Sequence, residues 1–460
     1  MLTYEVVLYT TRHLPGRAKP YMIRWRVGTE LHSKSYQTKT QADGRTSELR
    51  SAAGKGEQFD TETGLPVSEL RKLQSQTTWY QHAVAFCAMK WPRASAKSRS
   101  ARADALATLT PALVTDHTGA PAPEVLRTAL SCWAFNASPR RPDPPEHIAA
   151  ALAWIARKSV PVTDLADTEL LRSALDALLL RLDGTPAAAN TVTRKRNVFN
   201  NALRHAVERR HLTANPLQFI DWTPPETDDE IDWRHVPSPT QAAALIAAAP
   251  AQGPRGHHLS AFYGCLYYAA MRPAEATGLR ITDCTLPDSG WGELILAGSS
   301  PGVSSRWTDD GTTHDERGLK RRARKATRDI PIPPELVTLL RLHLKEHRPG
   351  PDGRVFSSAT GLPVTSNDYT YVWKDIRRAA LTPQQIASPF AEVPYSLRHA
   401  GVSLWLSSGV DPAEAARRAG HSIAVLYRFY AKILDGKREQ ANQQIDRALR
   451  EAQEAGAGEP

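Results

Sequence analysis

Residues 411–430 read DPAEAARRAGHSIAVLYRFY, and this stretch decides how the end of the chain folds. Asp411 is a favoured N-cap residue, and the proline after it and the acid three residues on complete a helix start of the capping-box type. Gly420 suits the end of that short helix. His421 is therefore expected at a turn, and the residues that follow it lead to Tyr430.

Two upstream stretches also contain residues that define their local structure. In MRPAEATGLR, residues 271–280, a proline follows Arg272 and disfavours helix at the arginine, so Arg272 is expected at a bend or at a new helix start. In YSLRHAGVSLWLSSGV, residues 395–410, Arg398 lies in a helical pattern. Each stretch therefore presents an arginine at a defined local position.

A small sheet is predicted between these two stretches. GELILAG (292–298) and RDIPI (328–332) read as two strands that flank a polar excursion. PPELVTLLRLHLKEH (333–347) reads as a helix that a Pro-Gly pair stops. The region from 240 to 460 is expected to be a mixed α/β domain with mainly helical content.

In this order, the three stretches resemble the motifs of the tyrosine recombinase, or phage integrase, family. A Gly-His pair followed nine residues later by a tyrosine is similar to the family's last motif. Residues 395–410 are similar to the second motif, in which an arginine stands three residues after a histidine, and MRPAEATGLR is similar to the first. Three ordered motifs are more specific than any one of them. The resemblance covers about half of the chain, from 240 to 440.

The resemblance implies a site-specific recombinase that breaks and rejoins DNA through a 3′-phosphotyrosine, with no metal, ATP or other cofactor. Such cleavage requires cations on the non-bridging oxygens, a nucleophile in line and an acid for the departing 5′ oxygen. Arg272 and Arg398 would supply the cations through paired guanidinium donors. Glu275 would orient Arg272 or pair with a neighbouring basic residue. His421 would donate to a non-bridging oxygen, and Tyr430 would attack the phosphorus.

The leaving-group acid in this family is a lysine on a strand turn. Here that lysine falls in GLKRRARKATRDIP, residues 318–331. We expect Lys320, which directly follows the polar excursion and fits the hairpin, with Lys325 as the alternative. Read without the resemblance, the same cluster is a patch that steers phosphates.

One position departs from the family pattern, because the residue three before Arg398 is Tyr395 instead of histidine. A phenol can bind phosphate or the nucleophile, but its ordinary pKa near 10 makes it a poor base at neutral pH. His399 is not expected to take over, since adjacent helical residues point about 100° apart. Tyr427 lies one helical turn from Tyr430, so either tyrosine could face the site. Tyr430 is chosen as the nucleophile because it lies nine residues after His421.

The sequence favours no metal site. His343 and His347 share a helix face, but no third ligand lies near them in sequence, so they are expected to be exposed polar residues late in a helix. The four cysteines are scattered without a CxxC pair, which argues against a zinc site or disulfides and fits a reducing, cytoplasmic setting.

The rest of the chain is expected to form two DNA-binding modules and a linker. Residues 1–75 read as a small β-sheet with a helix over 40–53, residues 76–222 as all-α, and 223–239 as a linker rich in proline and acid. The two modules resemble the arm-type and core-binding DNA-binding domains of integrases. The whole is a multidomain protein with a catalytic domain at 240–460.

Candidate DNA contacts are basic residues in both modules. Those of the first module are expected on its strands, where alternation puts Arg24 and Arg26 on one face. Those of the second lie in a basic loop and near a helix start, where the macrodipole disfavours cations unless a phosphate is present. They are Arg24, Arg26, Lys34, Lys39, Lys90, Arg93, Lys97, Arg99, Arg194, Lys195 and Arg196. A solvated basic face is the alternative explanation.

The net charge of +10 favours nucleic acid as the partner, and the family resemblance implies double-stranded DNA. No stretch is apolar enough for a membrane helix. The family resemblance implies attachment-type DNA sites, a homotetramer in the synaptic complex, a tail after Tyr430 that packs on a neighbouring copy, and a directionality factor. Two other functions stay open, namely a DNA-binding regulator without catalysis and a type IB-like topoisomerase.

Overall fold

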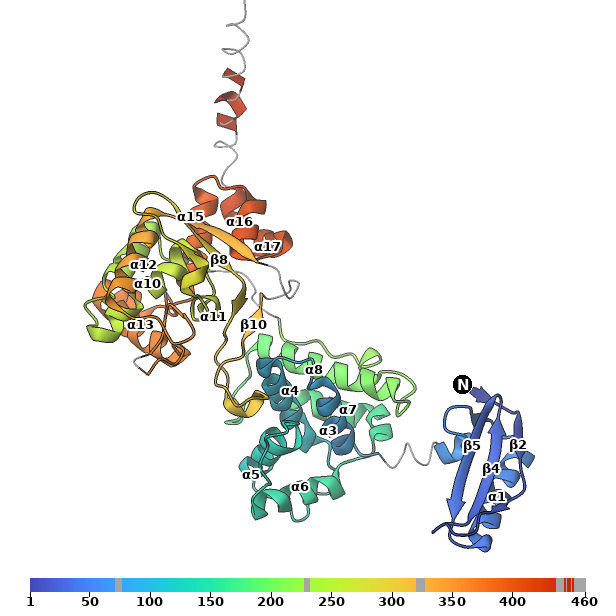
Figure 1. The fold of residues 1–460 in the computed structure, drawn as a ribbon. Coiled ribbons are helices and arrows are strands. Elements are labelled where there is room, and N and C mark those ends of the chain that lie inside the picture. The colour runs from blue at the N-terminus through green and yellow to red at the C-terminus, as the bar shows by residue number, and fades with distance from the viewer. Residues whose placement is uncertain are drawn as a thin grey trace, which may run out of the picture. The chain divides into compact units, whose positions relative to one another are not determined.

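The computed structural model describes residues 1–70, 77–226, 232–319, 327–358 and 360–435, with short helical pieces at 442–443, 445–447 and 449–450. The chain divides into two compact units, Met1–Glu226 and Thr227–Pro460. Both are mainly helical and contain small sheets (Figure 1). Within the described residues, no helix combines the length and the apolar character that crossing a membrane requires.

The first unit begins with a four-stranded antiparallel sheet around β4 (Tyr21–Val27). Its partners in the sheet are β2 (Val6–Leu8), β3 (Arg12–His13) and β5 (Glu30–Tyr36). Two-residue strands β1 (Leu2–Thr3) and β6 (Phe59–Asp60) pair with each other. The helix predicted here is α1 (Lys39–Gly54), whose N-cap is Thr38. The expected small sheet and helix are present.

Alternation along β4 divides its side chains between two faces. Ile23, Trp25 and Val27 are buried and pack with α1, while Arg24 and Arg26 share the opposite face, as predicted. Arg24 lies over the Tyr9 ring, 5.6 Å from its centroid. The prediction that the strands carry Lys39 is wrong, because Thr38 caps the helix and Lys39 is its first residue.

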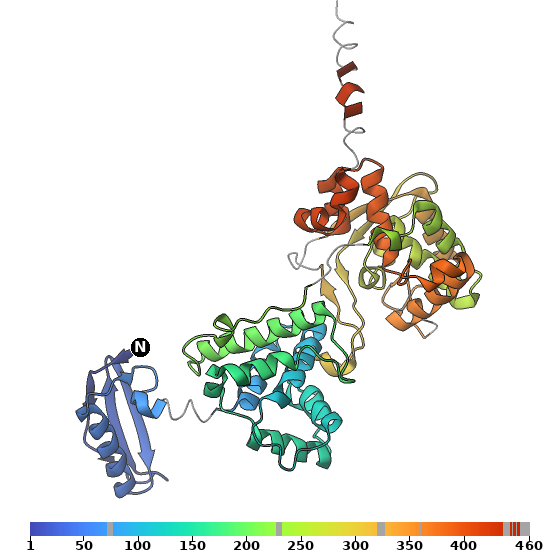
Figure 2. The same ribbon diagram turned by 180° about the vertical axis from the view of Figure 1, so that it is seen from behind.

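The helical part of the first unit follows from residue 77 (Figures 1 and 2). Its α-helices are α3 (Trp79–Lys90), α4 (Ala96–Leu109), α5 (Pro123–Thr128), α6 (Glu146–Lys158), α7 (Thr168–Asp176) and α8 (Ala189–Glu208), with a π-helical turn at Ala129–Ala134. A capping box between Thr78 and Gln81 starts α3. Trp79 is fully buried against Phe199 of α8, and α8 also packs on α4.

Two expectations for the basic residues of this part are wrong. The basic loop is largely helix, because α4 already begins at Ala96, and Arg99 is buried with its guanidinium 4.3 Å from the Trp91 ring centroid. The cations at Arg194–Arg196 do not lie at a helix start, because α8 begins at Ala189 and the macrodipole acts mainly on the first turn.

Lys195 is also buried, and its ammonium group donates to the Thr108 hydroxyl at 2.8 Å and lies 3.3 Å from the Asp104 carboxylate. Arg99 and Lys195 therefore hold helices together in this structure and do not present their charges to a partner. Lys90, Arg93, Lys97 and Arg194 remain exposed.

The second unit packs helices around a three-stranded antiparallel sheet of order β11-β8-β7. The strands are β7 (Cys284–Thr285), β8 (Gly292–Leu296) and β11 (Arg328–Ile332), and a separate pair joins β9 (Gly298–Ser299) to β10 (Arg317–Gly318). The two strands predicted at 292–298 and 328–332 are confirmed, and they pair directly.

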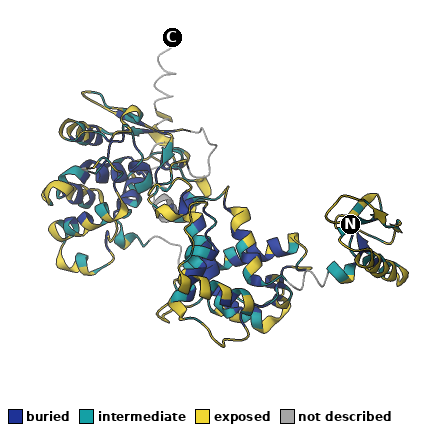
Figure 3. Cartoon of the chain, turned by 60° about the horizontal axis from the view of Figure 1, so that its bottom comes forward, coloured by how far each residue is buried: buried dark blue, intermediate teal, exposed yellow. Residues whose placement is uncertain are grey.

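The helices of this unit enclose one core, whose buried residues are dark blue in Figure 3. They are α9 (Pro239–Ala247), α10 (Gly253–Tyr268), α11 (Pro273–Ala276), α12 (Pro334–Glu346), α13 (Ser366–Ala380), α14 (Pro383–Ala387), α15 (Ser396–Ser407), α16 (Pro412–Ala419) and α17 (Ile423–Asp435). α15 lies close against α10, since a Cβ on Gly401 would come 2.0 Å from the Tyr267 carbonyl oxygen.

Part of the predicted linker is folded. Trp233–His235 form a 3-10 turn, and Trp233 and Val236 pack against the core of the second unit. The backbone N–H of Ala391 donates to the His235 carbonyl at 2.9 Å. The aromatic and aliphatic residues at the end of the acidic segment thus belong to the second unit and contribute to its packing.

Candidate active site

Arg272 lies where the sequence placed it, at the N-cap of α11. The proline that follows starts the helix, and Glu275 in the first turn accepts from the Arg272 backbone N–H at 2.8 Å. The Arg272 guanidinium also donates to Glu275 at 2.8 Å and to the Gly420 carbonyl at 3.1 Å. Its side chain keeps a quarter of its surface exposed. Arg272 is therefore fixed by two elements and still reachable from solvent.

Glu275 is the centre of a buried charge network that the sequence indicated only in part. Arg328, the first residue of β11, donates to both carboxylate oxygens of Glu275, at 3.1 and 2.8 Å. Both side chains are almost completely buried. Burial alone would raise the pKa of Glu275, but Arg328 outweighs it and, with Arg398 and Arg272, lowers that pKa to about 2. The carboxylate stays charged and holds two arginines in place.

Gly420 closes this network from the other side. It ends α16 in the left-handed conformation at φ 63°, which glycine adopts without strain. A Cβ at this position would lie 2.2 Å from an Arg328 guanidinium nitrogen. The predicted helix end at Gly420 is confirmed, and the glycine also lets the backbone approach the arginines. The capping-box contact expected of Glu414 is absent, because Glu414 instead pairs with Arg417 and Arg418.

Arg398 is fully buried in α15. Its guanidinium donates to the carbonyls of Ala270 and Ala419, the latter at 2.6 Å, and to His421 Nε2 at 2.8 Å. The first carbonyl lies two residues before Arg272 and the second lies two residues before His421. Arg398 therefore joins the two segments that carry the other candidate residues, and its terminal nitrogens already have partners.

His421 follows the helix end, as predicted, and its protonation state follows from its contact with Arg398. A guanidinium can only donate, so the Nε2 atom that receives it must be unprotonated. Burial lowers the pKa of His421 to about 3, with help from the charges of Arg398 and Arg272. The remaining proton is thus assigned to Nδ1, a buried atom for which the described residues offer no hydrogen-bond partner. His421 presents a free N–H donor beside two cations.

Tyr430 lies inside this cluster and Tyr427 does not. Tyr430 is 1% exposed and Tyr427 is 50% exposed. The Tyr430 hydroxyl lies 3.0 Å from His399 Nδ1, and its ring is 6.3 Å from the His421 ring. Burial raises the pKa of the Tyr430 phenol, and Arg398 acts in the opposite direction.

The contact with His399 overturns the expectation that this histidine points away from the site. His399 is next to Arg398 in α15, but α17 packs against α15 and brings the Tyr430 hydroxyl to His399. Burial and the neighbouring Arg398 lower the pKa of His399 to about 4, so the imidazole is neutral near pH 7. A neutral imidazole can accept the phenol proton.

Two aromatic residues support this pair. Tyr395 precedes α15, and its ring meets the His399 ring edge-on with centroids 5.2 Å apart. Trp233, from the segment predicted as linker, packs on Tyr430 with centroids 5.5 Å apart. Tyr395 thus contacts His399, where the sequence had suggested phosphate or the nucleophile as its partner.

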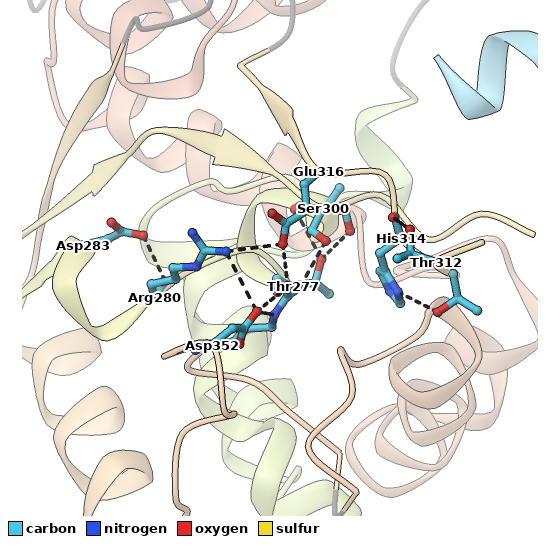
Figure 4. A network of polar contacts seen from close by, with 11 residues as sticks. Thr277, Arg280, Asp283, Ser300, Thr312, His314, Glu316 and Asp352 are labelled. Atoms are coloured by element: carbon cyan, nitrogen blue, oxygen red, sulfur yellow. Dashed lines mark hydrogen bonds and ion pairs between the residues drawn. The ribbon is translucent and has the colours of Figure 1, made fainter. Parts of the chain in front are cut away.

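A network of polar contacts holds the two ends of the polar excursion between β9 and β10, and Thr277, Ser300 and Glu316 belong to it (Figure 4). Buried Arg354 donates to the Thr277 carbonyl at 3.2 Å and to the Ser300 hydroxyl at 3.0 Å. It also donates to Glu316 at 2.9 Å and to Asp352 at 2.7 Å. Thr277 directly follows α11, so this network fixes both ends of the excursion beside Glu275.

Lys320 and Lys325 lie outside the described residues, and the structure places neither of them. The candidate DNA contacts Arg24 to Arg196 all belong to the first unit. Among the predicted site residues, the second unit therefore brings together Arg272, Glu275, Arg398, His421 and Tyr430, with Tyr395 one side chain away.

Sequence reasoning missed Arg328, Trp233 and the role of His399. The signal for Arg328 was available in the sequence, because Arg328 is the first residue of the predicted strand RDIPI (328–332). The other two contacts depend on how α17 and the 3-10 turn pack, which no local pattern gives.

Three comparisons with known proteins were made. No family model and no curated protein matches the chain. Solved structures are similar to it, among them a fragment of the Tn1549 transposon integrase in complex with circular intermediate DNA, with a TM-score of 0.46, 16% identity, and 65% of this chain and 95% of that chain covered.

Two further structures complete the comparison. The XerH site-specific recombinase bound to palindromic difH substrate has a TM-score of 0.43 and 12% identity, covering 75% of this chain and 96% of that chain. A lambda integrase dimer bound to a COC′ core site has a TM-score of 0.40 and 15% identity, covering 62% and 91%. In each of these comparisons the identity is below 20% and the TM-score is below 0.5.

Proposed function

We propose that this protein is a site-specific DNA recombinase that cleaves and rejoins strands through Tyr430. The observation that supports this most is the hydroxyl of a buried tyrosine held 3.0 Å from a neutral imidazole, beside a histidine that contacts a buried arginine. The order of the three sequence motifs and the net charge of +10 point to DNA as the substrate.

The cleavage step balances as follows. The Tyr430 oxygen forms a bond to phosphorus, the bond from phosphorus to the 5′ oxygen breaks, and His399 accepts the phenol proton. The bond energy is kept in the 3′-phosphotyrosine, so attack by a free 5′ hydroxyl reverses the step without ATP. Lys320 is the proposed acid for the departing 5′ oxygen, with Lys325 as the alternative.

The charge that develops on the phosphate is balanced by fixed groups. Arg272 is partly exposed and held by Glu275, so it can contact a non-bridging oxygen without losing its support. The Nδ1–H of His421 is a second donor with no partner among the described residues. Arg398 acts mainly by position and charge, because its terminal nitrogens are bound to carbonyls and to His421.

Recombination also needs several copies of the chain. Exchange between two duplexes cuts one strand from each duplex at a time and four strands in total, with one tyrosine for each, so we propose a homotetramer on double-stranded attachment-type sites. A directionality factor would then choose between integration and excision.

Covalent capture tests this proposal without knowledge of the DNA site. The full-length protein is incubated with a pool of duplexes that carry a randomised core and a nick, so that the cut end is lost and the adduct accumulates. We expect a protein–DNA adduct whose linked peptide contains Tyr430. The adduct should be absent in Tyr430→Phe and retained in Tyr427→Phe, the matched control.

The same material separates the two alternative functions. Binding without any adduct would show a DNA-binding regulator and overturn the proposal. Relaxation of a single supercoiled circle, with no exchange between two marked copies of a captured site, would show a topoisomerase.

A further inference from the structure

Four histidines gather on the second unit, outside the candidate active site. His257 and His258 lie in the first turns of α10, and His343 and His347 lie at the end of α12. The rings pack edge to face, with His258 centroids 5.0 Å from His343 and 4.8 Å from His347. Glu346 completes the group through its carboxylate, 3.4 Å from His257 Nε2.

This cluster corrects the sequence-based view of His343 and His347. His343 is buried, and its Nε2 atom lies 3.0 Å from the Val355 carbonyl, so it is not an exposed polar residue. The third ligand that the local sequence lacks comes from α10, about 90 residues earlier. The packing of α10 on α12 therefore brings a third ligand to the cluster, which the spacing of residues within one helix could not show.

We propose that His257, Glu346 and His347 bind a divalent transition metal ion of the zinc class. One nitrogen or oxygen ligand atom from each residue lies within 4.8 Å of the other two. Zinc takes nitrogen and carboxylate ligands at about 2.1 Å in a tetrahedron, which separates neighbouring ligand atoms by about 3.4 Å. The distance between His257 Nε2 and Glu346 Oε2 is 3.4 Å. Two ligands thus already have the required spacing, and His347 needs a small shift.

A second observation points to a ligand at the same place. His347 Nε2 is a buried polar atom without a hydrogen-bond partner among the described residues, and so is His343 Nδ1. Buried polar atoms are normally paired, and a metal ion would satisfy the nitrogen of His347. The His258 and His343 rings pack on His347 and limit its orientations.

The bound ion would tie α10 to α12. α10 leads to the segment that carries Arg272, and α12 follows the strand that begins with Arg328. A metal bridge at the opposite end of these helices would stabilise the frame around Glu275. It takes no part in the proposed cleavage, so the two proposals stand or fall separately.

The test is zinc binding by the full-length protein. Metal-free protein is dialysed against buffered zinc, and bound metal is measured by elemental analysis. Cobalt is then used as a spectroscopic probe, because a tetrahedral cobalt site gives intense visible bands. We expect one tightly bound ion per chain, the tetrahedral cobalt spectrum, and a higher melting temperature with zinc.

Conservative variants assign the ion to this cluster. His257→Asn, Glu346→Gln and His347→Asn should each weaken binding by more than about tenfold, the lower end of what even outer partners of a metal contribute. His147→Asn, an exposed histidine of the first unit, is the control and should bind as the native chain does. If the native chain does not retain zinc, or if the three variants bind zinc as tightly as the native chain, His257 and Glu346 form only a surface ion pair.

Discussion

Cations occur in two different settings in this protein. In the second unit, Arg328 and Arg398 are buried, and a carboxylate or backbone carbonyls hold them in place. In the first unit, Lys90, Arg93 and Lys97 are exposed on and beside α3 and α4. The first group has a fixed geometry at a high structural cost, and the second is free to follow a polyanion.

The difference separates two ways in which charge can serve a DNA enzyme. Fixed charges stabilise a reacting phosphate without having to reorganise, so they act on the chemical step. Exposed charges release counterions from DNA, so they act on affinity and its dependence on salt. Variants of the two regions should therefore change different measured quantities.

Among variants that keep the Tyr430 nucleophile, the largest effect on rate is expected at His399. His399→Ala removes the group that accepts the Tyr430 proton and should slow cleavage at saturating DNA by roughly 10²- to 10⁴-fold. Because its pKa is about 4, the native imidazole is already neutral near pH 6, and the native rate should change little from there to about pH 9. In the variant, hydroxide must remove the proton, so the rate should rise by up to about tenfold per pH unit.

Single-turnover cleavage of the captured site, followed over this pH range, measures both effects. DNA affinity and melting temperature serve as controls, since a proton acceptor should alter neither strongly. A His399→Ala rate close to native with an unchanged pH profile would mean that the contact with Tyr430 is only packing.

Glu275 tests the structural cost of the fixed cations. Glu275→Gln leaves Arg328 buried without its counter-charge, and loss of one partner of a buried pair costs about 3–5 kcal/mol of unfolding free energy. Urea unfolding of the native protein and the variant measures the loss. Glu392→Gln, an exposed acid in the same unit, should change stability little.

The pH dependence of stability gives an independent reading of the same network. The pKa of Glu275 is lowered from 4.5 to about 2 in the folded protein, so its contribution is complete above pH 4.5 and is lost as the pH falls toward 2. The variant should lack this part of the acid dependence. If the unfolding free energy of both proteins fell equally with acid, the charge of Glu275 would not be stabilised by Arg328.

Much of this site follows from local sequence rules, and the rest depends on packing. The helix stop at Gly420 and the N-cap position of Arg272 are set by glycine and proline, whose backbone preferences act within a few residues. The contact of His399 with Tyr430 needs α17 to pack against α15, and neither helix specifies that packing alone. Packing likewise turned Arg99 and Lys195 inward, where charge alone had suggested exposure.

The smallest effects are expected on the exposed surface of the first unit. Changing Lys90, Arg93 and Lys97 together to alanine should weaken DNA binding several-fold at moderate salt. The slope of log affinity against log salt should fall by about 0.9 for each phosphate that the variant no longer neutralises. Cleavage at saturating DNA should stay near native. Titrations at several salt concentrations measure the slope.

Arg99→Ala is the sharpest control, because the same helix carries it two residues after Lys97. Its guanidinium stacks on Trp91 and donates to the Trp91 carbonyl at 3.1 Å, so its loss should lower the melting temperature and leave the salt slope unchanged. If Arg99→Ala lowered the slope as an exposed lysine does, the side chain would have to leave Trp91 to meet DNA. The division between fixed and free cations would then not extend to the first unit.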